Sequence, residues 1–129
     1  MMAKQVIMPP GLRAAAEALN MSPAVTAGGL IFLTGATGGD SKGQMTTDPE
    51  TQMRNCFDKI NAVLAAADLT MDAVVEMTSY HVGLRDHFDL FDRVRLSCFS
   101  APYPAWTAVE VAGLRRTGAI VEIRTIAAL

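Results

Sequence analysis

Hydrophobic and polar positions alternate along two stretches near the C-terminus of the chain, and this pattern predicts two β-strands. The stretches are residues 104–111 (PAWTAVEV) and 120–127 (IVEIRTIA), and both are rich in β-branched residues. A short basic connection with two glycines joins them, so we expect the two strands to be adjacent. One aromatic residue, Trp106, and one acid, Glu122, lie near the ends of this pair.

Further strands are predicted in the first two thirds of the chain. Residues 4–8 form a short strand that two prolines end. Residues 24–27 and 30–34 flank Gly28-Gly29, a two-residue loop of the kind that tight hairpins require. Residues 74–82 are rich in Val, Thr and Tyr, which favour the pleated sheet.

Apolar residues at three- and four-residue intervals predict two amphipathic helices. The first begins after Asp48, whose carboxylate can cap the helix, and runs to about residue 67. The second spans about residues 86–99. A shorter helix is expected over residues 12–19.

The order strand, hairpin, helix, strand, helix, two strands predicts one mixed sheet with both amphipathic helices on one face. This is an α+β fold, and 129 residues suit a single domain over residues 1–129. No helix remains to cover the other face of the sheet. Half of the residues are hydrophobic, which is more than a lone monomer of this size needs, so we expect another subunit to cover that face.

Charge excludes some functional classes. The net charge is −2 and the basic residues are scattered, whereas binding to nucleic acid requires several phosphates to be neutralised together. Nucleic acid is therefore not an expected partner. Residues 1–10 lack the pattern of a secretory signal, and no apolar run has the length of a membrane span. A cytoplasmic location is expected, with no membrane partner.

Motifs for cofactors and metals are missing from the sequence. The run 35–43 (GATGGDSKG) follows a strand, but it fits neither the Walker spacing nor the dinucleotide-binding spacing, so we interpret it as a mobile loop. Cys56 and Cys98 are expected to be buried free thiols. His81 is predicted to be a half-buried strand residue and His87 a surface residue. No cofactor and no metal site are expected.

Glu122 and Trp106 each allow two interpretations from the residues alone. A carboxylate inside an apolar strand either pairs with a cation, here Arg124 on the same face, or carries out acid–base chemistry. A tryptophan near the start of a strand anchors a core or an interface, or it binds a ligand by stacking.

Several segments resemble the Rid/YjgF family, whose members include reactive intermediate (enamine/imine) deaminases and which is also labelled L-PSP endoribonuclease or translation inhibitor. They are residues 27–35 (AGGLIFLTG), the helix after Asp48, and residues 104–111 followed by 121–123. The resemblance covers residues 20–129. It implies a chorismate-mutase-like subunit, a homotrimer with a central β-barrel, and ligand clefts between subunits.

The resemblance also implies a set of pocket residues. Glu122 matches the carboxylate that positions or activates the attacking water. The substrate-binding positions are Thr34, Gly35, Trp106, Ala24, Asp92 and Ala108. Thr34 and Gly35 agree with the family, whereas the other four differ from its arginine, tyrosine, asparagine and cysteine. Trp106 replaces the arginine that binds the substrate carboxylate, and losing such a charge-assisted pair costs about 1.5–3 kcal/mol.

Three functions remain open at this stage. The first is deaminase-like hydrolysis of a small imine, enamine or related compound, with altered specificity. The second is non-catalytic binding of a metabolite by a regulatory trimer. The third is ribonuclease activity or translation inhibition, which the acidic composition disfavours. The expected partners are a small molecule and further copies of the chain.

Overall fold

A computed structural model describes residues 4–129. Its elements are β1 (Gln5–Ile7), α1 (Arg13–Leu19), β2 (Ala24–Ala27), β3 (Leu30–Leu33), β4 (Ala36–Thr37), α2 (Pro49–Ala66), a 3₁₀ turn (Met71–Ala73), β5 (Val74–His81), α3 (Leu84–Cys98), β6 (Ala105–Glu110) and β7 (Val121–Ala128). Residues 1–3, which belong to the predicted domain and to the stretch tested for a secretory signal, lie outside the described part.

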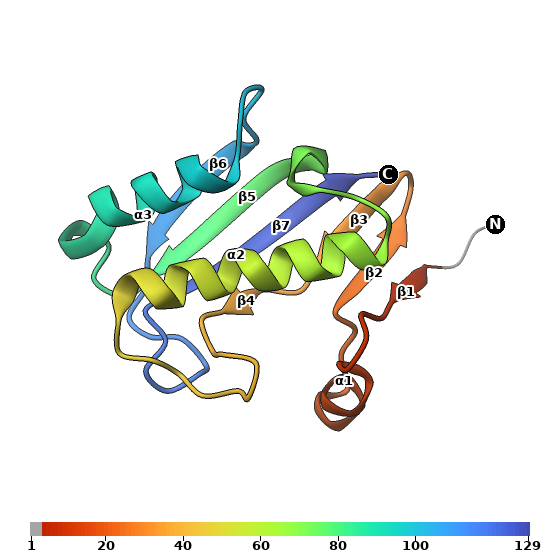
Figure 1. The fold of residues 1–129 in the computed structure, drawn as a ribbon, viewed down its shortest axis with the longest axis horizontal. Coiled ribbons are helices and arrows are strands. Elements are labelled where there is room, and N and C mark those ends of the chain that lie inside the picture. The colour runs from red at the N-terminus through yellow and green to blue at the C-terminus, as the bar shows by residue number, and fades with distance from the viewer. Residues whose placement is uncertain (1–3) are drawn as a thin grey trace.

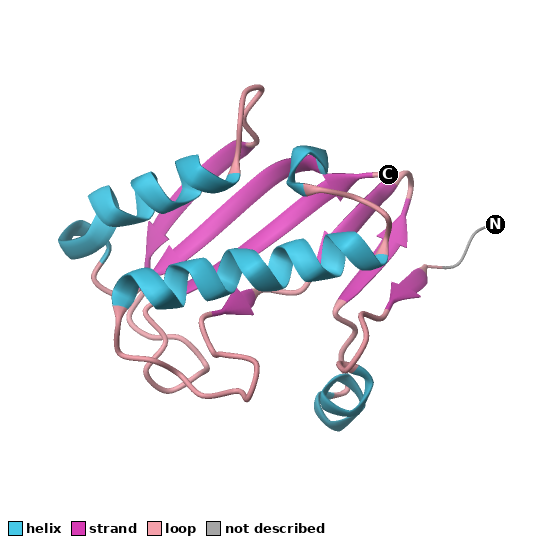
Figure 2. Ribbon diagram, viewed as in Figure 1, coloured by secondary structure: helices cyan, strands magenta, loops and turns pink. Residues whose placement is uncertain are grey.

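All strands belong to one mixed sheet in the order β1-β2-β3-β7-β5-β6, and β4 also pairs with β7. Helices α2 and α3 lie across one face of this sheet, while α1 lies beyond the ends of β1 and β2 (Figure 1). The prediction of an α+β fold with both amphipathic helices on one face is confirmed. No helix of the described chain covers the other face, which we call the open face (Figure 2).

The predicted adjacency of the last two strands is wrong. Strand β5 lies between β6 and β7, parallel to β6 and antiparallel to β7. The connection between β6 and β7 crosses the end of β5, because the Val111 N–H donates to the His81 carbonyl and the Val82 N–H donates to the Ile120 carbonyl. Helix α3 supplies the crossover that a parallel β5–β6 pair requires.

Helix α2 agrees closely with its prediction. The Asp48 carboxylate accepts hydrogen bonds from the backbone N–H and the hydroxyl of Thr51, at 2.9 and 2.6 Å, and Pro49 occupies the first turn. Its buried residues are Gln52, Met53, Cys56, Phe57, Ile60, Val63 and Leu64. All of them except Gln52 belong to the main hydrophobic core, together with residues of β3, β5 and β7.

The hairpin between β2 and β3 and the end of α1 both depend on residues with positive φ angles. Gly28 and Gly29 both have positive φ angles, 60° and 79°, as a tight hairpin between β2 and β3 requires. Asn20 ends α1 with a φ of 54°.

Helix α3 begins at Leu84, two residues earlier than predicted, and has a kink at His87. Phe91 and Val94 are buried, and Phe88 packs on Trp106 although it is 36% exposed. The kink changes the direction of the first turn, so a regular helical period does not describe it.

The open face carries apolar and charged side chains in separate regions. Val25, Phe32 and Ile126 are cross-strand neighbours on β2, β3 and β7, and all three are half-buried. Glu122 pairs with Tyr80, and Arg124 pairs with Thr78, farther along the same sheet. The apolar part is available to another chain.

Candidate functional site

Strand β7 points Glu122 to the open face. Its neighbours Val121 and Ile123 are fully buried in the core beneath the helices, and successive side chains of a strand point to opposite faces. Glu122 lies between Tyr80 on β5 and Thr37 on β4.

A β-bulge places Thr34 and Gly35 next to this carboxylate. Phe32 pairs with Ile126 and Ala36 pairs with Ile123, so three intervening residues on the first strand oppose two on β7. A Cβ atom at Gly35 would collide with the Glu122 carboxylate. Only glycine therefore lets the carboxylate approach the backbone this closely.

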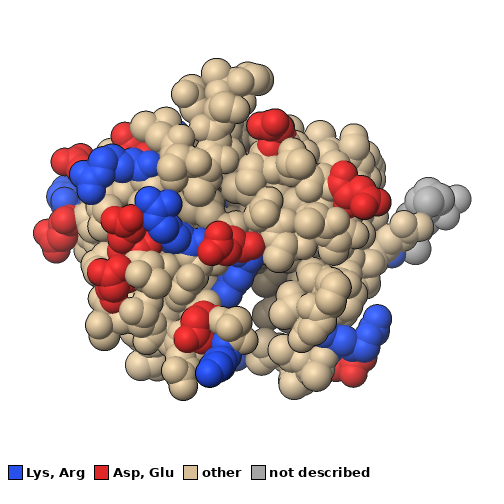
Figure 3. All heavy atoms as spheres, viewed as in Figure 1, with Lys and Arg blue, Asp and Glu red and all other residues tan. Residues whose placement is uncertain are grey.

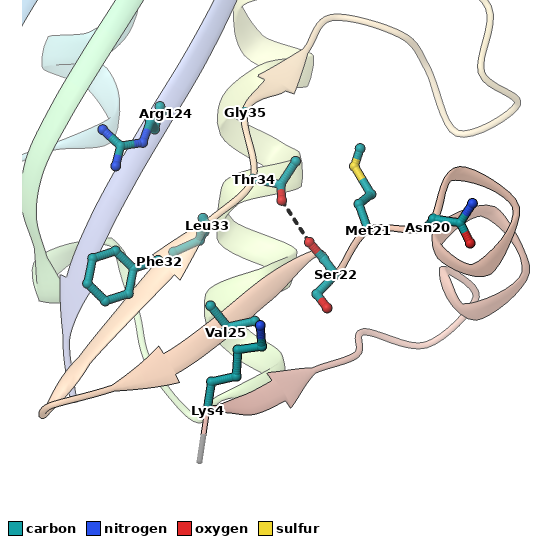
Figure 4. Close-up of a pocket in the computed structure, with 10 residues that line it drawn as sticks. All are labelled: Lys4, Asn20, Met21, Ser22, Val25, Phe32, Leu33, Thr34, Gly35 and Arg124. Carbon is teal, nitrogen blue, oxygen red and sulfur yellow. Dashed lines mark hydrogen bonds between the residues drawn. The ribbon is translucent and has the colours of Figure 1, made fainter. Parts of the chain in front are cut away.

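The bulge also forms part of the wall of an open cavity of about 500 Å³. Other wall residues are Lys4, Asn20, Met21, Ser22, Val25, Phe32, Leu33 and Arg124. In Figure 4, Phe32 and Arg124 lie on one side of the bulge, and Asn20 and Met21 lie on the other. The Thr34 hydroxyl donates to the Ser22 carbonyl at 2.7 Å and holds this wall together.

The possible ion pair between Glu122 and Arg124 does not form. Within residues 4–129, the ion pairs closer than 4 Å join Arg13 to Glu17, Arg54 to Glu50 and Arg95 to Asp92. The Glu122 carboxylate therefore has no cationic partner among the described residues, although it is half-buried.

Trp106 points to the other side of the sheet, beneath α3. Its indole N–H donates to the Ser79 hydroxyl at 2.8 Å. The Arg95 guanidinium lies 4.2 Å from the centre of the indole ring, and the Phe88 ring is parallel to the indole at 5.8 Å. Asp92 holds Arg95 at 2.7 Å. Within one chain, Trp106 is thus a packed residue with its donor satisfied.

The expected pocket residues therefore divide between two sides of the sheet. Thr34 and Gly35 lie beside Glu122, whereas Ala108 pairs with buried Ser79 on the side of Trp106. Ala24 is only 1% exposed and belongs to the core of the single subunit, and its role as a pocket residue stays a prediction. A cleft that contains both Trp106 and Glu122 requires a second chain.

A buried polar network next to Trp106 was missed by sequence reasoning. Ser79 accepts the indole N–H, and its hydroxyl oxygen also lies 2.8 Å from His81 Nε2, in a hydrogen bond whose direction depends on the tautomer of the imidazole. His81 is fully buried rather than half-buried, and its ring lies 5.8 Å from that of His87. Desolvation, and secondarily the charge of His87, lowers the pKa of His81 to about 4.

Two nitrogens of this histidine pair, His81 Nδ1 and His87 Nε2, are buried and have no hydrogen-bond partner. Burial also lowers the pKa of His87, while Asp86 opposes this effect. The i, i+2 spacing of Ser79 and His81 was a signal that they share a face. Ser79 and His81 are buried because α3 covers this face of the sheet, and their spacing in the sequence does not predict where α3 lies.

Both cysteines are free thiols. Cys56 is a buried free thiol whose pKa rises to about 12 because of desolvation, and Cys98 is a free, half-buried thiol. In the part of the chain that the structure describes, no three His, Cys or acidic side chains gather to hold a metal ion. In the same part, no helix is long and apolar enough to span a membrane.

Comparison with known proteins identifies the family. The sequence model described as Endoribonuclease L-PSP matches residues 12–129. The chain is 35% identical over 128 residues to the RutC family protein YjgH of Escherichia coli, covering 98% of this chain and 96% of that protein. The chain therefore belongs to the L-PSP endoribonuclease family, also called the Rid/YjgF family, as the resemblance implied.

Solved structures agree with the fold. A structure of protein YJGH superposes with a TM-score of 0.89 at 32% identity and covers 99% of this chain and 98% of that one. Escherichia coli TdcF with bound serine superposes with a TM-score of 0.78 at 26% identity, over 84% and 87% of the two chains.

Proposed function

We propose that the chain is a hydrolase that acts on a small imine, enamine or related compound, in a pocket between subunits of a homotrimer. The observation that carries this proposal is the Glu122 carboxylate. It is half-buried, has no cationic partner among the described residues, and lies against the glycine of a bulge beside an open cavity. A carboxylate in this position is suited to accept a proton from water.

The chemistry follows from this placement. Glu122 accepts a proton from a water molecule while the water oxygen adds to the carbon of the C=N bond. The protonated Glu122 returns this proton to the substrate nitrogen, which gives a carbinolamine. The hydroxyl proton of the carbinolamine then passes to the nitrogen as the C=O bond forms and the C–N bond breaks. The products are a carbonyl compound and ammonia, so one water is consumed for each imine. Thr34 and Gly35 form the wall against which the substrate lies.

A small polar ligand suits this pocket. The related protein TdcF has a structure with bound serine, which supports a ligand of similar size here. A second copy of the chain would bring the Trp106 side of one subunit to the Glu122 side of another. Trp106, Asp92 and Ala108 would then shape specificity. Arg95 keeps a positive charge beside Trp106, at the position where the resemblance implies an arginine in the active deaminases.

Hydrolysis of 2-aminoacrylate, generated in the assay, tests the proposal. We expect Glu122→Gln to lower the rate by about 10²-fold or more, because the amide cannot accept the proton. Glu76→Gln, which changes an exposed acid on the neighbouring strand β5, is the control and should retain the rate. Equal rates in the wild type and Glu122→Gln would overturn the catalytic role.

A non-catalytic metabolite-binding trimer is the second candidate, and Trp106 in place of the family arginine favours it. In that case no imine is hydrolysed, and Glu122→Gln changes only ligand affinity and stability. RNA cleavage is disfavoured, since the net charge is −2 and Lys and Arg are interspersed with acids on the face that Figure 3 shows. Salt-dependent RNA binding would contradict this judgement.

A further inference from the structure

Two basic side chains from distant parts of the chain meet above Gly39. Lys59 comes from α2, and Arg116 comes from the connection between β6 and β7. A Cβ atom at Gly39 would lie 3.4 Å from both terminal nitrogens of Arg116 and 3.5 Å from Lys59 Nζ. The absence of a side chain at Gly39 thus lets three nitrogens with N–H donors gather over its backbone.

The donors of these two side chains are only partly used. Lys59 Nζ donates to the Thr37 carbonyl at 2.7 Å, and Arg116 Nη2 donates to the Gly43 carbonyl at 2.7 Å. An ammonium has three N–H donors and a guanidinium has five, so several remain. Neither side chain lies within 4 Å of a carboxylate in residues 4–129.

The local charge is therefore uncompensated at close range. Lys59 and Arg116 are both half-buried. Desolvation is the main cause that lowers the pKa of Lys59, and Arg116 lowers it further, while Asp40 opposes the effect. Asp40 directs one carboxylate oxygen to the N–H groups of Lys42 and Gln44 instead. In the space-filling view, basic atoms lie in a recess beside the middle of α2 (Figure 3).

We propose that Lys59 and Arg116, which meet over Gly39, form a binding site for the phosphate group of a small molecule. A guanidinium binds two oxygens of a phosphate side by side, and an ammonium adds a point charge. Two positive charges match a phosphate dianion better than a carboxylate. No phosphate-binding motif marks the glycine-rich stretch 35–43 in the sequence. The two cations of the proposed site come instead from α2 and from the connection between β6 and β7.

This site is separate from the proposed reaction site. Helix α2 lies on the covered face of the sheet, whereas Glu122 points to the open face. Failure of the hydrolase proposal therefore leaves the phosphate site standing, and the reverse also holds.

Isothermal titration with inorganic phosphate, at constant ionic strength in chloride, tests the proposal. The full chain should bind phosphate saturably, and acetate at least about tenfold more weakly. Arg116→Gln keeps a donor for the Gly43 carbonyl, removes the charge, and should weaken phosphate binding by about tenfold or more. Lys59→Gln keeps a donor for the Thr37 carbonyl, removes the charge, and should have a similar effect.

Lys42→Gln is the matched control, because it removes an exposed lysine from the same loop, and it should change the affinity less than about twofold. Circular dichroism checks the folding of each variant, and one folded variant of the two is sufficient if the other fails to fold. Non-saturable binding, acetate affinity equal to that of phosphate, or unchanged affinity in a folded variant that lacks either cation would overturn the proposal.

Discussion

The carboxylate of Glu122 and the backbone of Gly35 depend on each other. The bulge brings the backbone against the carboxylate, and the lack of a side chain at Gly35 makes the contact possible. This contact links a residue from the first third of the chain to one near its end. At this scale, the candidate site consists of one acid and the glycine that accommodates it.

Gly35→Ala should displace the Glu122 carboxylate, because the new Cβ would occupy its place. We expect a loss of about 1–3 kcal/mol in the free energy of unfolding, as in other overpacked sites, together with lower hydrolase activity. Urea denaturation measures the stability. Gly113→Ala is the control, since nothing lies within 4 Å of a Cβ there. Equal stability of the two variants would contradict this account of the bulge.

His81 should make the stability depend on pH. Its pKa is about 4 in the folded chain and about 6.5 when unfolded, so the unfolded chain binds more protons between these values. The contribution is fully present above pH 6.5 and is lost as the pH falls towards 4, by about 3 kcal/mol. His81→Gln should flatten this part of the profile in urea denaturation between pH 7 and 4. Parallel profiles of variant and wild type would exclude His81 as the cause.

At the level of elements, single side chains join α2 and α3 to the sheet. Gln52 is 1% exposed, and its amide nitrogen donates to the Thr46 and Gly118 carbonyls at 2.7 and 2.9 Å. Its amide oxygen accepts the Ile120 N–H at 3.0 Å. The helical period places Gln52 on the buried side of α2. It does not indicate that the amide would form hydrogen bonds with two separate loops.

Trp106 connects α3 to β6, so we expect it to contribute to the stability of a single chain. Trp106→Phe keeps much of the ring but removes the donor to Ser79, which should cost about 1–3 kcal/mol in the free energy of unfolding. Chemical denaturation measures this change. Tyr103→Phe, at a residue that is 54% exposed, is the control and should be close to neutral. A neutral Trp106→Phe would show that the indole donor has no structural role.

For the whole molecule, the open face is the natural place for further copies of the chain. Val25, Phe32 and Ile126 form an apolar group there that no described element of the same chain covers. An oligomer would remove this surface from water and would bring the two groups of candidate pocket residues together.

Phe32→Glu should dissociate the proposed trimer into monomers, because the interface would have to bury a carboxylate without a partner. Light scattering coupled to gel filtration measures the mass, and circular dichroism checks the fold. Leu96→Glu, on the outer side of α3 where the side chain is 45% exposed, should remain trimeric. A folded Phe32→Glu trimer would exclude this face as the interface.

Local patterns in the sequence were enough to predict the hairpin at Gly28 and Gly29, the cap of α2 at Asp48 and the apolar stripe of α2. Each depends on residues within one or two turns of one another, so the chain carries the information locally. The family could also be predicted, because its segments occur in order from residue 20 onward. Glu122 and Gly35 were identified in this way, but their contact was not.

Only the tertiary structure decided the order of the strands and the direction of the side chains. Residues 104–111 and 120–127 have the same alternation whether they pair directly or flank β5, since hydrophobic period does not encode which strand is the neighbour. The loop between them is long enough for both arrangements. The insertion of β5 and the position of α3 placed Trp106 beneath a helix and Glu122 on the open face, because packing between distant segments determines which side of a strand is covered.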